Sequence, residues 1–264
     1  MASTVFEIPH SEYVIVLTNK DDAGRRFPFY LFFTVLIFFS CADFSAVKGE
    51  RELLRPIRRM SKKLSARGPV KFVNDATKSE IINSLDIDEY FLIEQGITGV
   101  VPIPANGIEQ TITTRYTLAD GNDVAAQYML EYFENLGYPE VFLQAFTQGG
   151  KRTHNIVAIK PGTTKPDEIV LVGAHMDSTS QSPSQNAPGC IDNGSGTAGT
   201  MTVAKAFANV TSARTIYFVL FSAEEQGLIG SEYFCEVATD EGLDIVAALT
   251  MDMIGYSNEF VGMS

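Results

Sequence analysis

The chain has 264 residues, of which 45% are apolar, so it is too apolar to be disordered throughout and long enough for one large domain or two small ones. Its formal net charge is −12, and the acidic excess lies in the body of the chain, where 8 lysines and arginines face 25 aspartates and glutamates from residue 72 onward. Because nucleic acid binding needs a concentrated basic face, this distribution excludes nucleic acid as a partner and favours cations, including metals.

The N-terminal residues 1–42 form a leader with a signal-like segment at 25–42. Two arginines, Arg25 and Arg26, precede the apolar run 27–39, which ends in the small residues Ser40, Cys41 and Ala42. A basic flank, a short apolar run and small residues at its end are typical of a secretory signal, whereas a membrane span needs about 20 apolar residues. We therefore expect a secreted or extracytoplasmic protein with no stable membrane span; the alternative is an uncleaved segment that anchors the protein in the membrane.

A basic segment, residues 43–75, follows the leader. Nine lysines and arginines lie between residues 48 and 71, and they include two dibasic pairs, at 58–59 and 62–63. This segment is either a propeptide, whose positive charge would dock on the acidic body and which would be cut at those pairs, or a solvated linker. The remaining residues, 76–264, are assigned to one folded domain.

Strands and helices alternate along that domain. Residues 77–93 have loosely helical spacing, a loop surrounds Pro102 and Pro104, and a clearer helix runs from residue 120 to the stop at Gly137. Strands are predicted at 140–146, 155–159, 168–173, 214–221 and 245–251, and further helices at 196–210 and 226–237. The run 168–173 is apolar without alternation, which suits a central strand covered on both faces. The fold class is therefore α/β, with a mainly parallel or mixed central sheet and helices on both faces.

Imidazole and carboxylate groups follow these apolar runs directly. His175 follows strand 168–173, Glu224 and Glu225 follow 214–221, Asp252 follows 245–251, and Asp192 lies in a glycine-rich loop before a helix. In open α/β sheets, ligands bind just beyond the carboxyl ends of the strands. The sequence therefore predicts that these groups meet at one edge of the sheet.

Each of these residues also has an ordinary explanation when taken alone. A histidine at a strand end is more often structural than a ligand, Asp192 could be a turn former or helix cap, and Glu224 and Glu225 could form an acidic first helical turn. Asp252 is harder to explain, because a charge after six apolar residues needs a partner if it is buried. Carboxylates at this density repel one another unless a cation lies between them. Zinc accepts such mixed ligands, so the pattern favours a metal site.

Four strings carry a resemblance to a known family. In chain order they are His175-Met176-Asp177-Ser178, Pro188-Gly189 with Asp192-Asn193-Gly194-Ser195-Gly196, Ala223-Glu224-Glu225-Gln226-Gly227-Leu228, and Met251-Asp252-Met253. They resemble the metal-binding motifs of the co-catalytic dizinc aminopeptidases, the family of the bacterial leucyl aminopeptidases, to which glutamate carboxypeptidases and glutaminyl cyclases are related. The resemblance extends from about Asp120 to the end of the chain and implies a zinc-exopeptidase fold.

The resemblance also implies roles for the motif residues. It makes His175 and Asp252 ligands of one zinc, Asp192 the carboxylate that bridges both, Glu225 a ligand of the second, Glu224 the general base and Asp177 the acceptor that orients His175. The implied reaction is hydrolysis of the N-terminal bond of a peptide substrate by a metal-bridged water, with two Zn²⁺ per complete site. Two metals acidify the water and stabilise the developing charge, while a carboxylate that is not a ligand takes the proton.

The sequence departs from the family pattern at two places. Ile191 stands where the family has another acid, from which we expect only a local effect. The family's second zinc also takes a histidine downstream of the Met-Asp-Met motif, whereas this sequence has none after His175. We therefore expect a metallopeptidase domain, and a sheet, that are incomplete at the C-terminal side, with one zinc position lost.

Two alternatives to the exopeptidase remain. One is a truncated member of the family that is non-catalytic or binds metal weakly. The other is a relative of the carboxypeptidases or glutaminyl cyclases. Near the proposed bridging carboxylate, Cys190 is expected to be a buried small residue, and a disulfide with Cys235 is the alternative.

Overall fold

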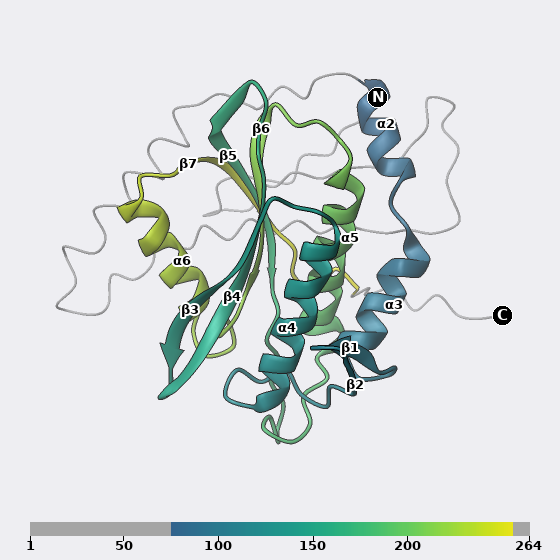
Figure 1. Cartoon of the computed structure of the whole chain (residues 1–264). Helices are drawn as coiled ribbons and strands as arrows, with labels where there is room; N and C mark the ends of the chain where they lie inside the picture. Colours follow the sequence, from purple (N-terminus) through teal and green to yellow (C-terminus); the bar gives the residue numbers. More distant parts are fainter. Residues whose placement is uncertain (1–74, 256–264) are drawn as a thin grey trace, which may run out of the picture.

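The computed structural model describes residues 75–255, and its centre is a sheet of five strands in the order β3-β4-β6-β5-β7 (Figure 1). The strands are β3 (Glu140–Gln148), β4 (Lys151–Lys160), β5 (Lys165–His175), β6 (Arg214–Phe221) and β7 (Asp244–Thr250). β5 pairs in parallel with β6 and with β7, whereas β4 is antiparallel to both β3 and β6. The expected α/β fold is confirmed, and of the two sheet types predicted the sheet is the mixed one.

The leader at 1–42 and nearly all of the basic segment at 43–75 lie outside the described residues. Within residues 75–255, no helix combines the length and apolar character that crossing a membrane requires. Within the described residues, β7 is an edge strand of the sheet.

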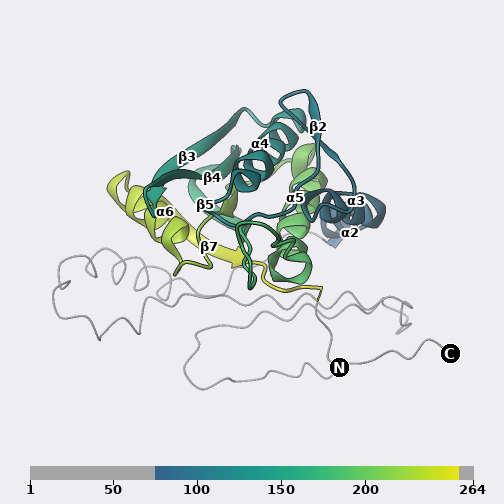
Figure 2. The same ribbon diagram turned by 90° about the horizontal axis from the view of Figure 1, so that it is seen from below.

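Helices cover both faces of the sheet, as predicted. The helices α4 (Asp120–Asn135) and α5 (Gly196–Ala208) lie on one face and α6 (Ile229–Asp240) lies on the other, which the view from below in Figure 2 also shows. Two further helices, α2 (Asp75–Asn83) and α3 (Ile87–Ile97), pack against α5 on the side away from the sheet.

Side chains of β6 show why its sequence is apolar without alternation from Ile216 onward. Phe218 and Leu220 belong to the core between the sheet and helices α4 and α5, while Val219 and Phe221 belong to the core under α6. Because successive side chains of a strand point to opposite faces, a strand with a core on each side must be apolar at every position. β5, predicted as a central strand, has the same character and lies between β6 and β7.

Three element predictions were wrong in detail. The single helical segment expected at 77–93 is two helices, because the side chain of Asp86 accepts hydrogen bonds from the backbone N–H groups of Asp88 and Glu89 and so begins α3. The helix expected from residue 226 begins at Ile229, after a turn that ends at Leu228. The loop expected around Pro102 and Pro104 contains a small hairpin of β1 (Ile103–Ala105) and β2 (Ile108–Gln110).

Candidate metal centre

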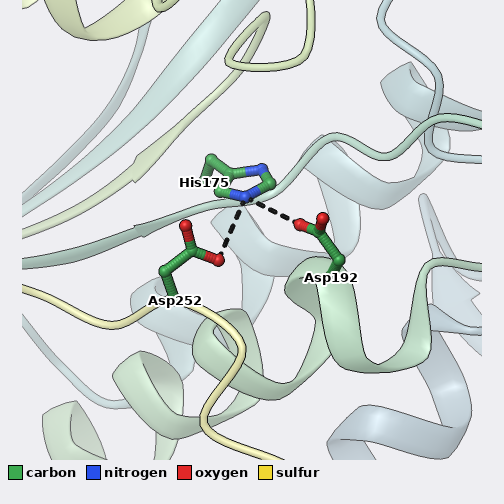
Figure 3. A group of neighbouring side chains, drawn as sticks. All are labelled: His175, Asp192 and Asp252. Atoms are coloured by element: carbon green, nitrogen blue, oxygen red, sulfur yellow. Dashed lines mark ion pairs between the residues drawn. The ribbon is translucent and has the colours of Figure 1, made fainter. Parts of the chain in front are cut away.

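The carboxyl ends of the parallel strands bring three predicted ligands together (Figure 3). His175 is the last residue of β5, Asp252 follows β7, and Asp192 lies in the turn Cys190–Ser195 that leads into α5. Nε2 of His175 lies 3.2 Å from Oδ1 of Asp192 and 3.6 Å from Oδ1 of Asp252. One potential ligand atom from each residue lies within 4.8 Å of the other two. The predicted meeting of these side chains at one sheet edge is therefore observed.

The chemistry of this group fits a zinc ion. The His175 side chain is buried, and Oδ1 of Asp252 is a buried atom with no hydrogen-bond partner in the described part of the chain. One imidazole nitrogen and two carboxylate oxygens that face a common point are a ligand set that zinc accepts. An unpartnered buried oxygen is costly, and a cation at this point would satisfy it.

A protonated imidazole places a positive charge among these carboxylates. Burial by itself lowers the pKa of His175, but the nearby carboxylates of Asp177, Asp192 and Asp252 outweigh it and raise the pKa to about 12. The same contact with His175 lowers the pKa of Asp192. Because a zinc ligand must be a neutral imidazole, a zinc ion held by His175 would displace this proton.

The turn after β6 places Glu224 beside the three-residue group. Oε2 of Glu224 lies 4.0 Å from Nε2 of His175. The pKa of Glu224 is raised, and burial is the largest cause. Glu225 is not a member of the group of three. Burial is the largest cause that raises the pKa of Glu225 to about 7, and the negative charge of Asp192 raises it further.

Asp177 connects the histidine to this turn. Its carboxylate is fully buried, and Oδ1 lies 3.6 Å from Nδ1 of His175, on the opposite side of the ring from the nitrogen that faces Asp192 and Asp252. Oδ1 also accepts a hydrogen bond from the backbone N–H of Glu224 (3.0 Å), and Oδ2 accepts from the N–H of Glu225 (3.2 Å). One buried carboxylate therefore fixes the backbone of the two glutamates as well as facing the histidine, a role that sequence reasoning had not assigned to it.

The backbone on either side of the carboxylates is strained. Ala223, which precedes Glu224, has φ +59°, and Met253, which follows Asp252, has φ +50°. Residues with a Cβ rarely adopt this left-handed conformation, and they keep it only where the surrounding structure imposes it. Both positions adjoin groups that the sequence analysis assigned to the metal site.

Arg115 is a part of the site region that sequence reasoning missed. Its side chain is fully buried, and its guanidinium donates to four backbone carbonyls. They are those of Met176 (2.7 Å from Nε), Ile97 (2.9 Å from Nη1), Gly189 (2.8 Å from Nη2) and Pro188. Burial lowers the pKa of Arg115 to about 10, which keeps it charged at neutral pH. The guanidinium thus joins the end of β5 to the loop that leads to Asp192.

The only sequence signal for Arg115 was a single charge in a stretch of threonines, which does not point to any particular partner. Gly189, one of its acceptors, has φ +51°, and a Cβ there would overlap the carbonyl oxygen of Asp192 and the side chain of Ser178. A glycine is therefore required at this position for steric reasons.

Cys190 corrects one expectation. It is exposed instead of buried, and its thiol donates to Oε1 of Glu94 at 3.4 Å. Neither Cys190 nor Cys235 is part of a disulfide. The neighbouring Ile191 is 39% exposed.

Known proteins are similar to this chain over part of its length. Residues 155–262 match the model of peptidase family M28. A probable leucine aminopeptidase of Trichophyton verrucosum is 40% identical in an alignment of 112 positions, which covers 39% of this chain and 30% of that protein. A probable zinc metalloprotease of Pyrenophora tritici-repentis is 35% identical over 105 residues, 39% of this chain and 24% of that protein. An aminopeptidase of Pseudomonas aeruginosa is 37% identical over 107 residues, 40% of this chain and 19% of that protein.

Solved structures share the fold. LapB of Legionella pneumophila superposes with a TM-score of 0.57 at 24% identity, over 70% of this chain and 48% of that one. A leucine aminopeptidase precursor of Bacteroides thetaiotaomicron superposes with a TM-score of 0.50 at 15% identity, over 62% of this chain and 61% of that one. Of the three sequence relatives in the previous paragraph, the chain spans less than a third of the length. The resemblance to the zinc aminopeptidases that the four motifs predicted is confirmed.

Proposed function

We propose that this chain, whose residues 155–262 match the M28 peptidases, carries a zinc site and the general base of an exopeptidase that hydrolyses N-terminal peptide bonds. The observation that carries the proposal is the convergence of His175, Asp192 and Asp252 on one point, with Glu224 beside them. The similarity to probable leucine aminopeptidases supports an N-terminal direction of cleavage. A peptide with a free α-amine is the substrate class that follows.

In this proposal Nε2 of His175 and the carboxylates of Asp192 and Asp252 hold one zinc ion. Asp192 and Glu225 are the residues that would hold a second ion. Bound zinc supplies Lewis-acid chemistry, polarising the scissile carbonyl and acidifying the attacking water. Asp177 keeps the ring of His175 oriented from the Nδ1 side.

Glu224 is the residue that we assign to move the proton. Its carboxyl lies 4.0 Å from the metal-facing nitrogen of His175, so it reaches the space in front of the ligands. Burial raises the pKa of Glu224, which makes the carboxylate a stronger base than an exposed glutamate. The hydrogen bond from its backbone N–H to Asp177 holds the turn in place.

The experiment measures zinc content and hydrolysis of leucyl-p-nitroanilide by the purified full chain. Replacing the base by Glu224→Gln should leave zinc content unchanged and lower the rate roughly 10²–10⁴-fold. Glu236→Gln, which changes an exposed glutamate on α6, should change neither. A chain that holds no zinc and cleaves no aminoacyl substrate would refute the proposal.

Three other outcomes would identify the alternatives. Zinc binding without hydrolysis of any substrate would identify a metal-binding but non-catalytic member. Cleavage of N-acylated peptides from their C-terminus would identify a carboxypeptidase. Cyclisation of an N-terminal glutamine without peptide cleavage would identify a glutaminyl cyclase relative.

Export is part of the same proposal. It rests on the signal-like segment at 25–42 and on the basic segment at 43–75 as a propeptide. N-terminal sequencing of the protein recovered from cells and from their medium tests both. A mature N-terminus within residues 40–75 in the medium would support them, whereas intact protein confined to the cytosol would refute them.

A further inference from the structure

Asn193, the residue after Asp192, contacts the backbone on both sides of Asp252. Its side chain is fully buried. Its Nδ2 donates to the carbonyl of Met251 at 2.9 Å, and its Oδ1 accepts from the backbone N–H of Met253 at 3.2 Å. The side chain of Asn193, which follows the proposed zinc ligand Asp192, therefore hydrogen-bonds to both residues that flank the proposed ligand Asp252.

We propose that Asn193 is a positioning residue that fixes Asp252 relative to Asp192, so that the two carboxylates face His175 as one rigid unit. The proposal rests on the proposed function, because it concerns how that zinc site is held. Asp192 and Asp252 are 60 residues apart in sequence and belong to different segments, the turn before α5 and the segment after β7. Their relative position must be set by contacts between those segments.

The segment after β7 depends on this contact. The sheet holds it as far as Met251, whose N–H donates to the carbonyl of Gly173 at 2.8 Å. Met253 then has a left-handed backbone, φ +50°, which is unfavourable unless neighbouring groups impose it. The hydrogen bond from the Met253 N–H to Oδ1 of Asn193 is such a constraint. Without it, we expect the backbone at Met253 to relax and carry the Asp252 carboxylate away from His175.

Close packing leaves Asn193 little freedom. Its Oδ1 also accepts from the N–H of Gly196, the first residue of α5, at 2.9 Å. A Cβ at Gly196 would overlap both Oδ1 of Asn193 and the carbonyl oxygen of Met251. The helix start, the turn and the segment after β7 thus meet at one amide group.

Only an amide of this length satisfies these partners. Asn193 faces one carbonyl and two N–H groups, so it has to donate at one end and accept at the other. An aspartate would set a carboxylate oxygen against the carbonyl of Met251. It would also add a negative charge next to Asp192 and Asp252, which on electrostatic grounds alone would attract zinc.

The test measures the affinity of the purified full chain for zinc by competition with a chromogenic chelator, and its visible absorption with Co²⁺ in place of zinc. Asn193→Ala should weaken zinc affinity roughly 10–100-fold, the range for partners that orient metal ligands, and should alter the Co²⁺ spectrum. Asn193→Asp should also weaken zinc affinity, although the added negative charge by itself would strengthen zinc affinity. This variant retains the shape of the side chain and provides the readout if the alanine variant fails to fold.

The matched control is Asn155→Ala. Asn155 is also fully buried, and its amide donates to the carbonyl of Gly230 (2.7 Å) and to Oε1 of Gln144 (2.9 Å) and accepts from the N–H of Ser222 (3.0 Å). None of these hydrogen-bond partners adjoins His175, Asp192 or Asp252 in the sequence. We expect this variant to lower the melting temperature while leaving zinc affinity within about twofold of the unmodified chain, far below the loss expected for a partner of the ligands.

A double-mutant cycle tests whether Asn193 acts through Asp252. In the background of Asp252→Ala, the further change Asn193→Ala should cost little additional affinity, because the group that it positions is absent. Equal zinc affinity and an equal Co²⁺ spectrum in the unmodified chain and Asn193→Ala would overturn the inference, and so would an equal loss of affinity in Asn155→Ala. If the unmodified chain binds no zinc, the proposed function itself fails.

Discussion

Replacing Arg115 by methionine is the perturbation whose cost follows most directly from the structure. Methionine fills a similar space but has no donor, so it removes all the hydrogen bonds that the guanidinium makes to backbone carbonyls. The carbonyl of Gly189 keeps a second donor, the N–H of Gly194 at 2.8 Å. The other three carbonyls, of Met176, Ile97 and Pro188, lose the charged donor that they share.

The size of the effect can be estimated from these three groups. A buried acceptor left without its partner costs about 1–3 kcal/mol, and part of that sum is offset because methionine avoids the desolvation of a buried cation. We expect the free energy of unfolding to fall by roughly 4 kcal/mol, within the range for breaking a buried charged network. For a domain of this size each kcal/mol lowers the melting temperature by about 2–4 °C, so the shift is roughly 8–16 °C.

The assay is urea unfolding of the full chain followed by circular dichroism, with two companion variants. Arg115→Lys keeps the charge but replaces a planar fork by a compact ammonium with three donors, so it should recover only about half of the loss, roughly 2 kcal/mol. Arg214→Met is the matched surface control: Nε of Arg214 lies 2.6 Å from Oε2 of Glu168, but the side chain is 29% exposed, and its loss should cost under about 1 kcal/mol. An Arg115→Met variant no less stable than Arg214→Met would refute the reasoning.

Three further predictions concern the site itself. Asp177→Asn should lower the free energy of unfolding by roughly 2–3 kcal/mol, because an amide cannot accept from the Thr117 hydroxyl and from the N–H groups of Glu224 and Glu225 together. Thr117→Val, which removes only the hydroxyl that donates to Asp177 at 3.1 Å, should cost about 1 kcal/mol. Equal unfolding midpoints in urea for the two variants would contradict this. Because the pKa of His175 in the metal-free protein is raised to about 12, its ion pairs stabilise the fold fully below the unfolded value of about 6.5 and are lost only as pH rises through the folded value. At pH 7–9 zinc must therefore release about one proton, which calorimetry in buffers of different ionisation enthalpy measures and which His175→Ala should abolish. Saturating zinc, at about 1,000 times its Kd, should add roughly 4 kcal/mol to the stability of the full chain and chelation should remove it, whereas a melting temperature unchanged by zinc would contradict the metal site.

Local sequence patterns predicted most of the elements because burial leaves a periodic trace. The continuous apolar runs at 168–173 and 214–221 mark strands β5 and β6, which have a core on each face. The groups that end those runs, His175 and Glu224, then had to reach the same edge of the sheet, because parallel strands align their carboxyl ends. Periodicity does not show where a helix is interrupted. Asp86 divides the segment that was expected as one helix, because its side chain caps the start of α3.

The sequence by itself thus determined the strands, their apolar character on both faces, and which polar side chains stand at their ends. Only the tertiary structure decided how those side chains are held. Arg115 donates to carbonyls 61 and 74 residues away, and Asn193 to a carbonyl 58 residues away. Such bonds join a side chain to a backbone carbonyl, a group that every residue has, so nothing in the sequence of the acceptor marks it. The motifs predict the metal ligands, and the folded chain adds which buried groups contact the segments that carry them.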